Sequence, residues 1–178
     1  MADFPNLPCH DENGSVLVVV EAPRGSIVKL KYEPKLGVFL FHRALQLGLA
    51  YPYDWGFIPS TRAEDGDPLD AMVLFDAPTW PGVVIPSRAL GVVRLVQREG
   101  KGSKTRNDRI IAVPADDERY EDVSDLPKSQ RQQLETFFAS VGRLAGKEVE
   151  IEGWDKAAKA SRVIEKAVRA YVDRGEGS

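Results

Sequence analysis

This chain of 178 residues contains a single cysteine, and neither positive nor negative charge is in strong excess. Cys9 is the single cysteine, which excludes an intrachain disulfide and a cysteine-based zinc site. The 24 basic and 27 acidic residues give a formal net charge of −3, which argues against a general nucleic-acid-binding or membrane-binding surface. We therefore expect any anion-binding chemistry in this protein to be local.

Long hydrophobic runs are missing as well. No stretch approaches the roughly 20 apolar residues that a membrane span needs, and residues 1–14 lack the apolar segment of a signal peptide. The two histidines, His10 and His42, form no spacing with acidic residues that would bind a transition metal. The sequence predicts a cytoplasmic protein with neither a membrane nor a nucleic-acid partner.

The distribution of apolar residues predicts the fold class. Short β-branched runs separated by Pro and Gly extend from Ser15 to about Val113, a pattern typical of a barrel or sandwich. Two later segments, 124–146 and 155–171, have apolar side chains at helical spacing and flank one short strand. We predict a single domain over residues 1–178, mainly β with flanking helices (α+β), in which two helices from the C-terminal half cover a small barrel. Residues 1–14 and 172–178 read as loose ends.

The segment "AEDGDPLDAMV", residues 63–73, crowds four acidic residues into seven positions. The simplest structural interpretation is a solvated turn, because Asp, Gly and Pro are strong turn formers. Asp70, however, has apolar neighbours inside a predicted strand, and the aromatic stretch "YPYDWGFIPS" upstream is typical of a cleft wall. Carboxylates forced together repel one another unless a cation relieves them, and hard oxygen ligands suit Mg²⁺ or Mn²⁺. The residues alone favour a metal site and an ordinary turn equally.

The order of these motifs along the chain resembles that of the family I soluble inorganic pyrophosphatases, from about Val16 to Tyr171. The element D-G-D-P-x-D is the signature of that family. The resemblance implies an OB-like five-stranded barrel, a homo-oligomer that is commonly a hexamer in bacteria, and Mg²⁺-dependent hydrolysis of inorganic diphosphate. The segments that carry it are "VEAPRGSIVKLKYE", "LGVFLFHR", "YPYDWGFIPST", "AEDGDPLDAMVL", "PGVVIPSRALGVV", "IIAVPADDERYEDVSDLP", "LETFF" and "VEIEGWD".

The resemblance also implies roles for individual residues. Asp65 and Asp70 would hold the activating metals, while Asp67 would contribute to that site and orient or deprotonate the attacking water. Glu21 matches an acid that supports the metal ligands from behind. The positions that would bind the substrate are Lys29, Arg43 and Tyr51.

The second half of the implied site departs from the family pattern. The family usually has an acidic loop of D-E-x-x-x-D-x-K type, whereas this chain reads "QREGKGSKTRNDRIIAVP". Gln97 and Asn107 occupy the two metal-ligand positions, and Arg109 replaces the lysine. Asn107 or Asp108 could still offer an oxygen ligand. Further departures are Lys31, His42, Trp55, Val141 and Gly142, of which the last two replace a phosphate-binding Tyr-Lys pair.

The basic residues of this loop permit two interpretations. Their charge could replace that of a metal, because arginine binds phosphate oxygens in pairs. The loop could equally be ordinary solvated surface, as most Lys/Gly/Ser-rich segments are. On the first interpretation, the candidate substrate ligands are Arg98, Lys104, Arg106 and Arg109.

Three functions are consistent with these observations. The first is a Mg²⁺-dependent inorganic pyrophosphatase with modified or weakened activity, for which Mn²⁺ could replace Mg²⁺. The second is a hydrolase of another phosphoanhydride, such as a nucleotide or organic diphosphate, and the third is a non-catalytic phosphate-binding homologue. The retained signature carboxylates favour an enzyme, because a scaffold has no reason to keep repelling charges together. We expect the first function.

Overall fold

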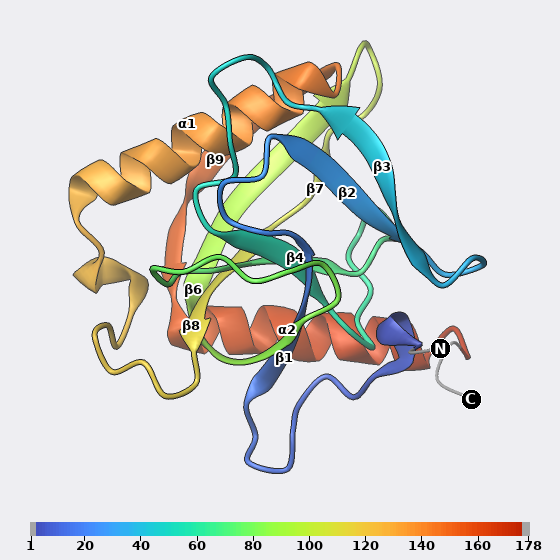
Figure 1. Cartoon of the computed structure of the whole chain (residues 1–178), viewed down its shortest axis with the longest axis vertical. Coiled ribbons are helices and arrows are strands. Elements are labelled where there is room, and N and C mark those ends of the chain that lie inside the picture. Colours follow the sequence, from blue (N-terminus) through green and yellow to red (C-terminus); the bar gives the residue numbers. More distant parts are fainter. Residues whose placement is uncertain (1–2, 176–178) are drawn as a thin grey trace.

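The computed structural model describes residues 3–175 and shows a mainly β fold with two α-helices, as the sequence predicts (Figure 1). Two short 3₁₀ turns, η1 and η2, precede the first strand and the first helix. The strands are rich in Val and Ile, whose branched side chains pack well on a pleated sheet. In this part of the chain the elements are η1 (Phe4–Asn6), β1 (Val16–Ala22), β2 (Val28–Glu33), β3 (Val38–Ala44), β4 (Asp54–Ile58), β5 (Leu69–Val73), β6 (Val84–Glu99), β7 (Thr105–Arg106), β8 (Arg109–Pro114), η2 (Val123–Asp125), α1 (Lys128–Leu144), β9 (Lys147–Lys156) and α2 (Ala157–Val172).

Five of these strands close into a ring. β1 pairs with β4, β4 with β5, β5 with β8 and β8 with β6, and β6 returns to pair with β1. The β5–β8 pair is parallel, and the other four pairs of the ring are antiparallel. The ring confirms the predicted five-stranded barrel. β7 and β9 pair with the far end of β6 and extend the sheet beyond the ring.

Two glycines are required where the strands of the barrel cross closely. A Cβ at Gly56 on β4 would lie 1.8 Å from the carbonyl oxygen of Val19 on β1. A Cβ at Gly91 on β6 would lie 2.4 Å from the carbonyl oxygen of Asp155 on β9. Gly91 also lies at a register shift in the pairing of β6 with β8, where the long strand bends. Only glycine fits either position without moving the neighbouring backbone.

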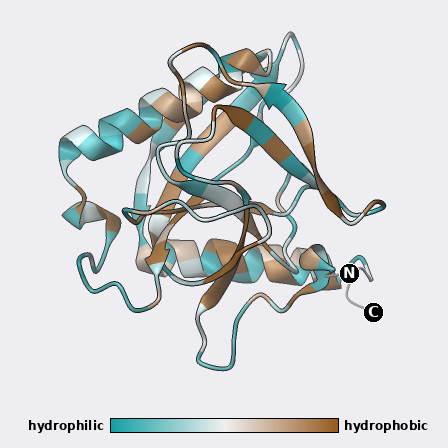
Figure 2. Cartoon of the chain, viewed as in Figure 1, coloured by the Kyte–Doolittle hydropathy of each residue, from teal (hydrophilic) through white to brown (hydrophobic). Residues whose placement is uncertain are grey.

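The two helices cover different parts of the barrel, and their apolar faces lie against the strands (Figures 1 and 2). Burial of each large apolar side chain stabilises the fold by roughly 1.5–3 kcal/mol, which is why these faces hold the helices in place. None of the helices in the described part of the chain is both long and apolar enough to span a bilayer. The buried helical residues are Leu134, Phe137 and Phe138 on α1 and Ala160, Ile164, Ala167 and Tyr171 on α2.

The N-terminal segment, predicted to be a loose end, packs against the body of the protein through Phe4, Leu7 and Cys9. The ring of Phe4 lies 5.2 Å from that of Tyr32 and 5.5 Å from that of Phe39, between the barrel and the β2–β3 hairpin. The Tyr171 hydroxyl donates a hydrogen bond to the Asn6 side chain, which ties α2 to the same segment. Apolar Phe4 therefore anchors this end. The final three residues of the other predicted loose end lie outside the described residues.

Candidate active site

A pocket of about 530 Å³ lies between the barrel, the β2–β3 hairpin and α1. The barrel contributes side chains from β1, β4, β5, β6 and β8, and the hairpin forms a wall of its own as a separate two-stranded sheet. The start of β9 completes the lining beside α1. The pocket gathers residues that are far apart in the sequence, including almost every position that the resemblance singles out.

The signature carboxylates lie together on one wall of this pocket. Asp65 and Asp67 flank Gly66 in the turn between β4 and β5, and Asp70 follows on β5. Gly66 has a φ of +91°, which glycine adopts readily, and the backbone N–H of Asp67 donates to Asp65 Oδ1 at 3.2 Å. Burial, together with the charge of Asp70, raises the pKa of Asp65. The segment therefore forms the turn that its sequence predicts, and the carboxylates of this turn line the pocket.

Glu21 lies behind these carboxylates at the end of β1 and is 7% exposed. Its Oε1 accepts a hydrogen bond from the backbone N–H of Tyr32 at 2.8 Å. Burial raises the pKa of Glu21 to about 7, while the Tyr32 hydrogen bond opposes the rise and the charge of Asp70 adds to it. A carboxyl group that titrates near neutral pH in a pocket is suited to proton transfer.

The β2–β3 hairpin supplies a cationic wall. Lys29 and Arg43 are cross-strand partners in its register, and Lys31 follows on β2. Burial lowers the pKa of Lys29, and the nearby charge of Arg43 lowers it further. Burial lowers the pKa of Lys31, but the hydrogen bond from its Nζ to Asp67 Oδ2 at 3.1 Å and the charges of nearby carboxylates together outweigh burial, so that the pKa is raised. The hairpin thus brings ammonium and guanidinium groups opposite the carboxylates.

Arg109, at the start of β8, faces the same pocket. Its Nη1 donates hydrogen bonds to Asp70 Oδ2 and to Asn107 Oδ1. Its guanidinium carbon lies 5.2 Å from the centre of the Trp55 ring, and its side chain is 13% exposed. Trp55 therefore stacks on a resident arginine, and this contact could not be read from its position in the sequence.

Aromatic side chains form the floor between these two walls. Tyr51, which the sequence assigns to the substrate site, lines the pocket but is only 2% exposed, and its ring lies 5.1 Å from Phe137. Burial raises the pKa of Tyr51, so its hydroxyl remains protonated. Trp55 and Phe138 continue this apolar surface.

The helix α1 brings no cation to the pocket at the two positions where the resemblance places a Tyr-Lys pair. Val141 and Gly142 both line the pocket, and a Cβ at Gly142 would lie 2.1 Å from Val149 Cγ2. The helix packs so closely on β9 here that a side chain at 142 has no space. Lys147, which our sequence reasoning missed, lines the pocket instead. Gly146, with a φ of +71°, ends the helix and leads the chain there, a signal that was readable as a helix stop.

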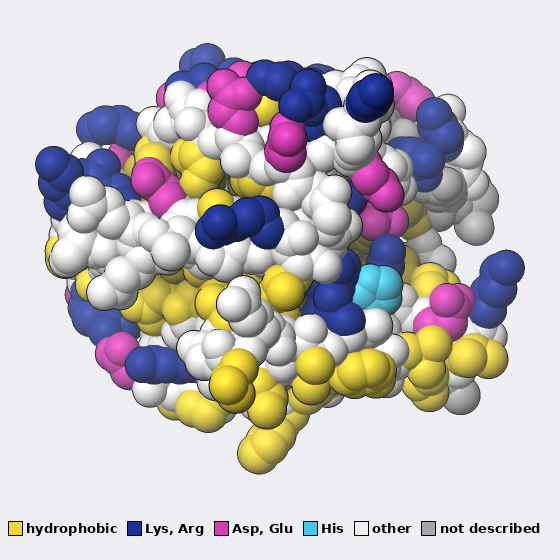
Figure 3. Space-filling model, turned by 90° about the horizontal axis from the view of Figure 1, so that it is seen from above, with side chains coloured by type: hydrophobic (Ala, Val, Ile, Leu, Met, Phe, Trp, Pro, Cys, Tyr) yellow, Lys and Arg dark blue, Asp and Glu magenta, His cyan; other side chains and the backbone are white. Residues whose placement is uncertain are grey.

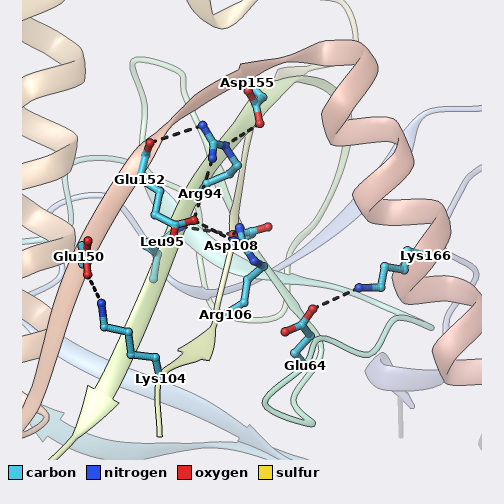
Figure 4. Close-up of polar contacts among 10 residues, drawn as sticks. All are labelled: Glu64, Arg94, Leu95, Lys104, Arg106, Asp108, Glu150, Glu152, Asp155 and Lys166. Carbon is cyan, nitrogen blue, oxygen red and sulfur yellow. Dashed lines mark hydrogen bonds and ion pairs between the residues drawn. The ribbon is translucent and has the colours of Figure 1, made fainter.

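The basic loop residues do not reach the pocket, contrary to the expectation for Arg98, Lys104 and Arg106. They pair instead with acidic residues of β9, as Figure 4 shows for Lys104 and Arg106. The antiparallel register places Arg98 directly opposite Glu148, and opposite charges on facing strands attract one another. The acidic partners are Glu148, Glu150 and Glu152, every second residue of β9.

The two other candidate ligands of this loop, Asn107 and Asp108, point in different directions. Asn107 lines the pocket, where its side-chain oxygen accepts from Arg109. Asp108 points the other way, and its Oδ1 accepts from the backbone N–H of Leu95 at 3.2 Å and from Arg106 at 3.3 Å (Figure 4). Asp108 is therefore not a ligand in this pocket, because its carboxylate binds the backbone of β6 at Leu95 and neutralises Arg106.

The pocket does not fit a preformed, protein-held metal centre. Within the described residues, no three acidic, histidine or cysteine side chains converge as metal ligands would. One carboxylate oxygen of Asp67 and one of Asp70 are already paired with Lys31 and Arg109, respectively. The amide oxygen of Asn107 is engaged by the same arginine. The chemistry of the carboxylates suits Mg²⁺, but fixed cations occupy their positions.

Fold and pocket together define a class: an OB-like barrel whose pocket has carboxylates on one wall and lysine and arginine side chains on another. The family model for inorganic pyrophosphatase matches residues 18–172. The chain belongs to the inorganic pyrophosphatase family, which confirms the resemblance to the family I enzymes. Its relatives carry the name of a diphosphate hydrolase, and that activity is the one that the comparisons support for this chain.

Relatives and solved structures cover nearly the whole chain. The inorganic pyrophosphatase of Synechocystis is 36% identical over 172 residues, which cover 95% of this chain and 99% of that protein. The Thermus thermophilus enzyme is 38% identical over 184 residues, covering 99% of this chain and 100% of the relative. A crystal structure of inorganic pyrophosphatase from Thermus thermophilus superimposes with a TM-score of 0.86 at 34% identity, covering 96% of this chain and 99% of that one.

Proposed function

We propose that this chain hydrolyses inorganic diphosphate to two phosphates in the pocket described above, with Mg²⁺ entering as the magnesium complex of the substrate. The observation that carries the proposal is the convergence of the three signature carboxylates with Lys29, Arg43 and Arg109 in one cavity. The substitution of Gln97 and Asn107 for acidic residues leads us to propose a weakened dependence on protein-bound metal. Mn²⁺ should substitute for Mg²⁺, because both prefer oxygen ligands.

The cations supply the charge that the reaction requires. Diphosphate is a polyanion, and its negative charge must be offset before a nucleophile can approach phosphorus. Lys29 and Arg43 would bind its oxygens from the hairpin. The protein contacts of Arg109 described here both use Nη1, so the remaining N–H donors of its fork are available for a phosphoryl oxygen.

The carboxylates supply the base. Asp67 would accept a proton from a water molecule as the water oxygen forms its bond to one phosphorus atom. The bridging P–O bond then breaks, and the second phosphate leaves with the bonding electron pair. Lys31, 3.1 Å from Asp67, holds this carboxylate at the edge of the pocket. Glu21, whose pKa is about 7, is a second group in the pocket that can hold a proton.

The proposal is tested by measuring phosphate release from diphosphate, ADP, ATP and an organic diphosphate across a range of Mg²⁺ and Mn²⁺ concentrations. We expect release from diphosphate, and we expect Asp67→Asn to lower turnover by roughly 100-fold or more. Arg119→Gln is the control, because Arg119 pairs with Asp117 and Asp76 outside the pocket. Release only from the larger substrates would assign another phosphoanhydride, and release from none would contradict an enzyme.

We also propose that the protein is a homo-oligomer, with the hexamer as the expected form. Figure 3 shows hydrophobic side chains gathered along one edge of the face seen from above. Large apolar side chains remain exposed on the hairpin and its flanking loops, and such surface is commonly covered by self-association. The most exposed apolar side chains of the hairpin and its flanking loops are Ile27, Leu36, Phe41 and Leu47.

A further inference from the structure

We propose that Arg109 is a resident cation that takes the place of a divalent metal ion between Asp70 and Asn107. The pocket would consequently hold fewer protein-bound divalent ions than its carboxylates alone would attract. This proposal rests on the proposed function in one respect, namely that the pocket receives an anionic phosphoanhydride. The placement of Arg109 itself follows from the backbone and from the contacts of its side chain.

The register of two strands places Arg109 beside Asp70. β5 and β8 run parallel, with Ala71 level with Ile110, so the residues that precede them lie side by side. Ala71 and Ile110 are fully buried and belong to the same core cluster. Because successive side chains point to opposite faces of a strand, Asp70 and Arg109 share the face toward the pocket. The pairing is therefore built into the sheet and does not depend on a chance rotamer.

The guanidinium is held on three sides. Asp70 and Asn107 both accept hydrogen bonds from Nη1, and the Trp55 ring lies 5.2 Å below the guanidinium carbon. The side chain is 13% exposed, so water does little to weaken these contacts. A planar guanidinium both stacks on an aromatic face and binds oxygens along its edge, which an ammonium group cannot do.

This arrangement excludes a metal ion from the same oxygens. Mg²⁺ binds its ligands at about 2.0–2.1 Å and repels a neighbouring cation, so Asp70 and Asn107 cannot serve both. Lys31 pairs with Asp67 at 3.1 Å in a more exposed ion pair, whose side chains are 49% and 61% exposed. Asp65 is the signature carboxylate that forms no ion pair within residues 3–175. Charge in the pocket is accordingly balanced, since the residues that line it include five acidic and five basic side chains.

The test counts bound Mn²⁺ by electron paramagnetic resonance in the absence of diphosphate. The wild type should bind at most one Mn²⁺ per chain with a Kd below about 100 μM. Arg109→Gln should bind one additional Mn²⁺, roughly tenfold or more tightly than any second ion in the wild type, because Asp70 and Asn107 are released. The double variant Asp70→Asn, Arg109→Gln should lose the added site. Arg94→Gln is the matched control, since Arg94 pairs with Asp155 at 2.7 Å on another face of the sheet.

Unchanged or weaker Mn²⁺ binding by a folded Arg109→Gln variant would overturn the inference. If that variant does not fold, the wild-type count decides, because two or more tightly bound ions per chain would equally overturn it. A calorimetric titration of diphosphate in EDTA separates this inference from the proposed function. We expect the wild type to bind metal-free diphosphate and Arg109→Gln to bind it roughly tenfold more weakly. If Arg109→Gln gains a Mn²⁺ site but neither protein binds diphosphate, the role of Arg109 as a resident cation is supported and the proposed substrate is contradicted.

Discussion

At the scale of single residues, the chemistry of this pocket is determined by which neighbour each charged group has. Asp67 and Asp70 form ion pairs with cations, whereas Glu21 is buried and accepts a hydrogen bond from the backbone N–H of Tyr32. The surroundings of these carboxyl groups therefore determine how each of them ionises. Those beside cations form ion pairs, while the pKa of Glu21 rises to about 7.

The raised pKa of Glu21 predicts a pH-dependent loss of stability. Its pKa is about 7 in the folded protein, against 4.5 for an ordinary glutamate, so the folded state binds this proton more tightly than the unfolded chain does. The contribution is fully present below pH 4.5 and is lost as the pH rises through 7. Glu21→Gln, whose Oε1 can still accept from Tyr32, should therefore be more stable than the wild type above pH 7, by at most about 3 kcal/mol.

The measurement is urea unfolding of wild type and variant between pH 5 and 8, without divalent cations or phosphates. The difference in free energy of unfolding should grow in favour of Glu21→Gln as the pH increases. Glu12→Gln, a change at an exposed residue outside the pocket, is the control. A difference between Glu21→Gln and the wild type that stays constant across this range would contradict the burial argument.

At the scale of elements, the ribbon formed by β6 and β9 explains what happens to the basic loop. Alternate side chains of β9 are acidic on one face, and the loop after β6 returns its basic residues to that face (Figure 4). The pairs neutralise both strands and hold the loop against the sheet. They also remove the loop cations from the pocket, so the charge there comes from Arg109 and the hairpin.

Neutralising the loop should therefore leave substrate binding intact. We predict that the variant Arg98→Gln, Lys104→Gln, Arg106→Gln changes diphosphate affinity and turnover by less than about twofold, since these side chains pair with β9. Its free energy of unfolding should fall only slightly, and less at high salt, because exposed ion pairs contribute little to stability. Lys29→Gln, a single change inside the pocket, is the comparison and should weaken diphosphate binding.

A loss of diphosphate affinity in the triple variant as large as that in Lys29→Gln would place the loop at the phosphates. The two variants can be compared by calorimetric titration at two ionic strengths, with circular dichroism to establish that both are folded.

The sequence predicted the elements well because their signals are local. Periodicity placed the strands and both helices, and the resemblance implied the closure of five strands into a barrel. The packed N-terminal segment was missed, because the contacts of Phe4 are with Tyr32 and Phe39, which lie far along the chain. A short polar segment containing one aromatic residue reads as a loose end until its partner is known.

Only the part of the candidate site that depends on local sequence signals was predicted from the sequence. The three signature carboxylates share a turn and a strand, so their proximity was readable from spacing. The partner of Arg109 depends on the register between β5 and β8, which are 39 residues apart at Asp70, and no local pattern reveals that register. The direction of Arg98, Lys104 and Arg106 likewise depends on how β9 pairs with β6.

At the scale of the whole molecule, the apolar surface of the hairpin predicts self-association. Phe41 is 65% exposed and Leu47 is fully exposed, which is costly for a protein working alone in water. We predict a mass several times 19.7 kDa in sedimentation at micromolar concentration. A single species at the monomer mass across a dilution series would contradict the proposed assembly. The cytoplasmic location remains a prediction from the sequence.

The hydrogen bond between Tyr171 and Asn6 shows that the first and last elements of the chain meet on one side of the barrel (Figure 1). A linker that joined η1 to α2 would therefore have only a short gap to span. New ends could then be opened at the exposed tip 100–103, between β6 and β7. Such a circular permutant would build the same ring from strands synthesised in a different order. We expect the pocket to form in this permutant, which would then hydrolyse diphosphate as the original chain does.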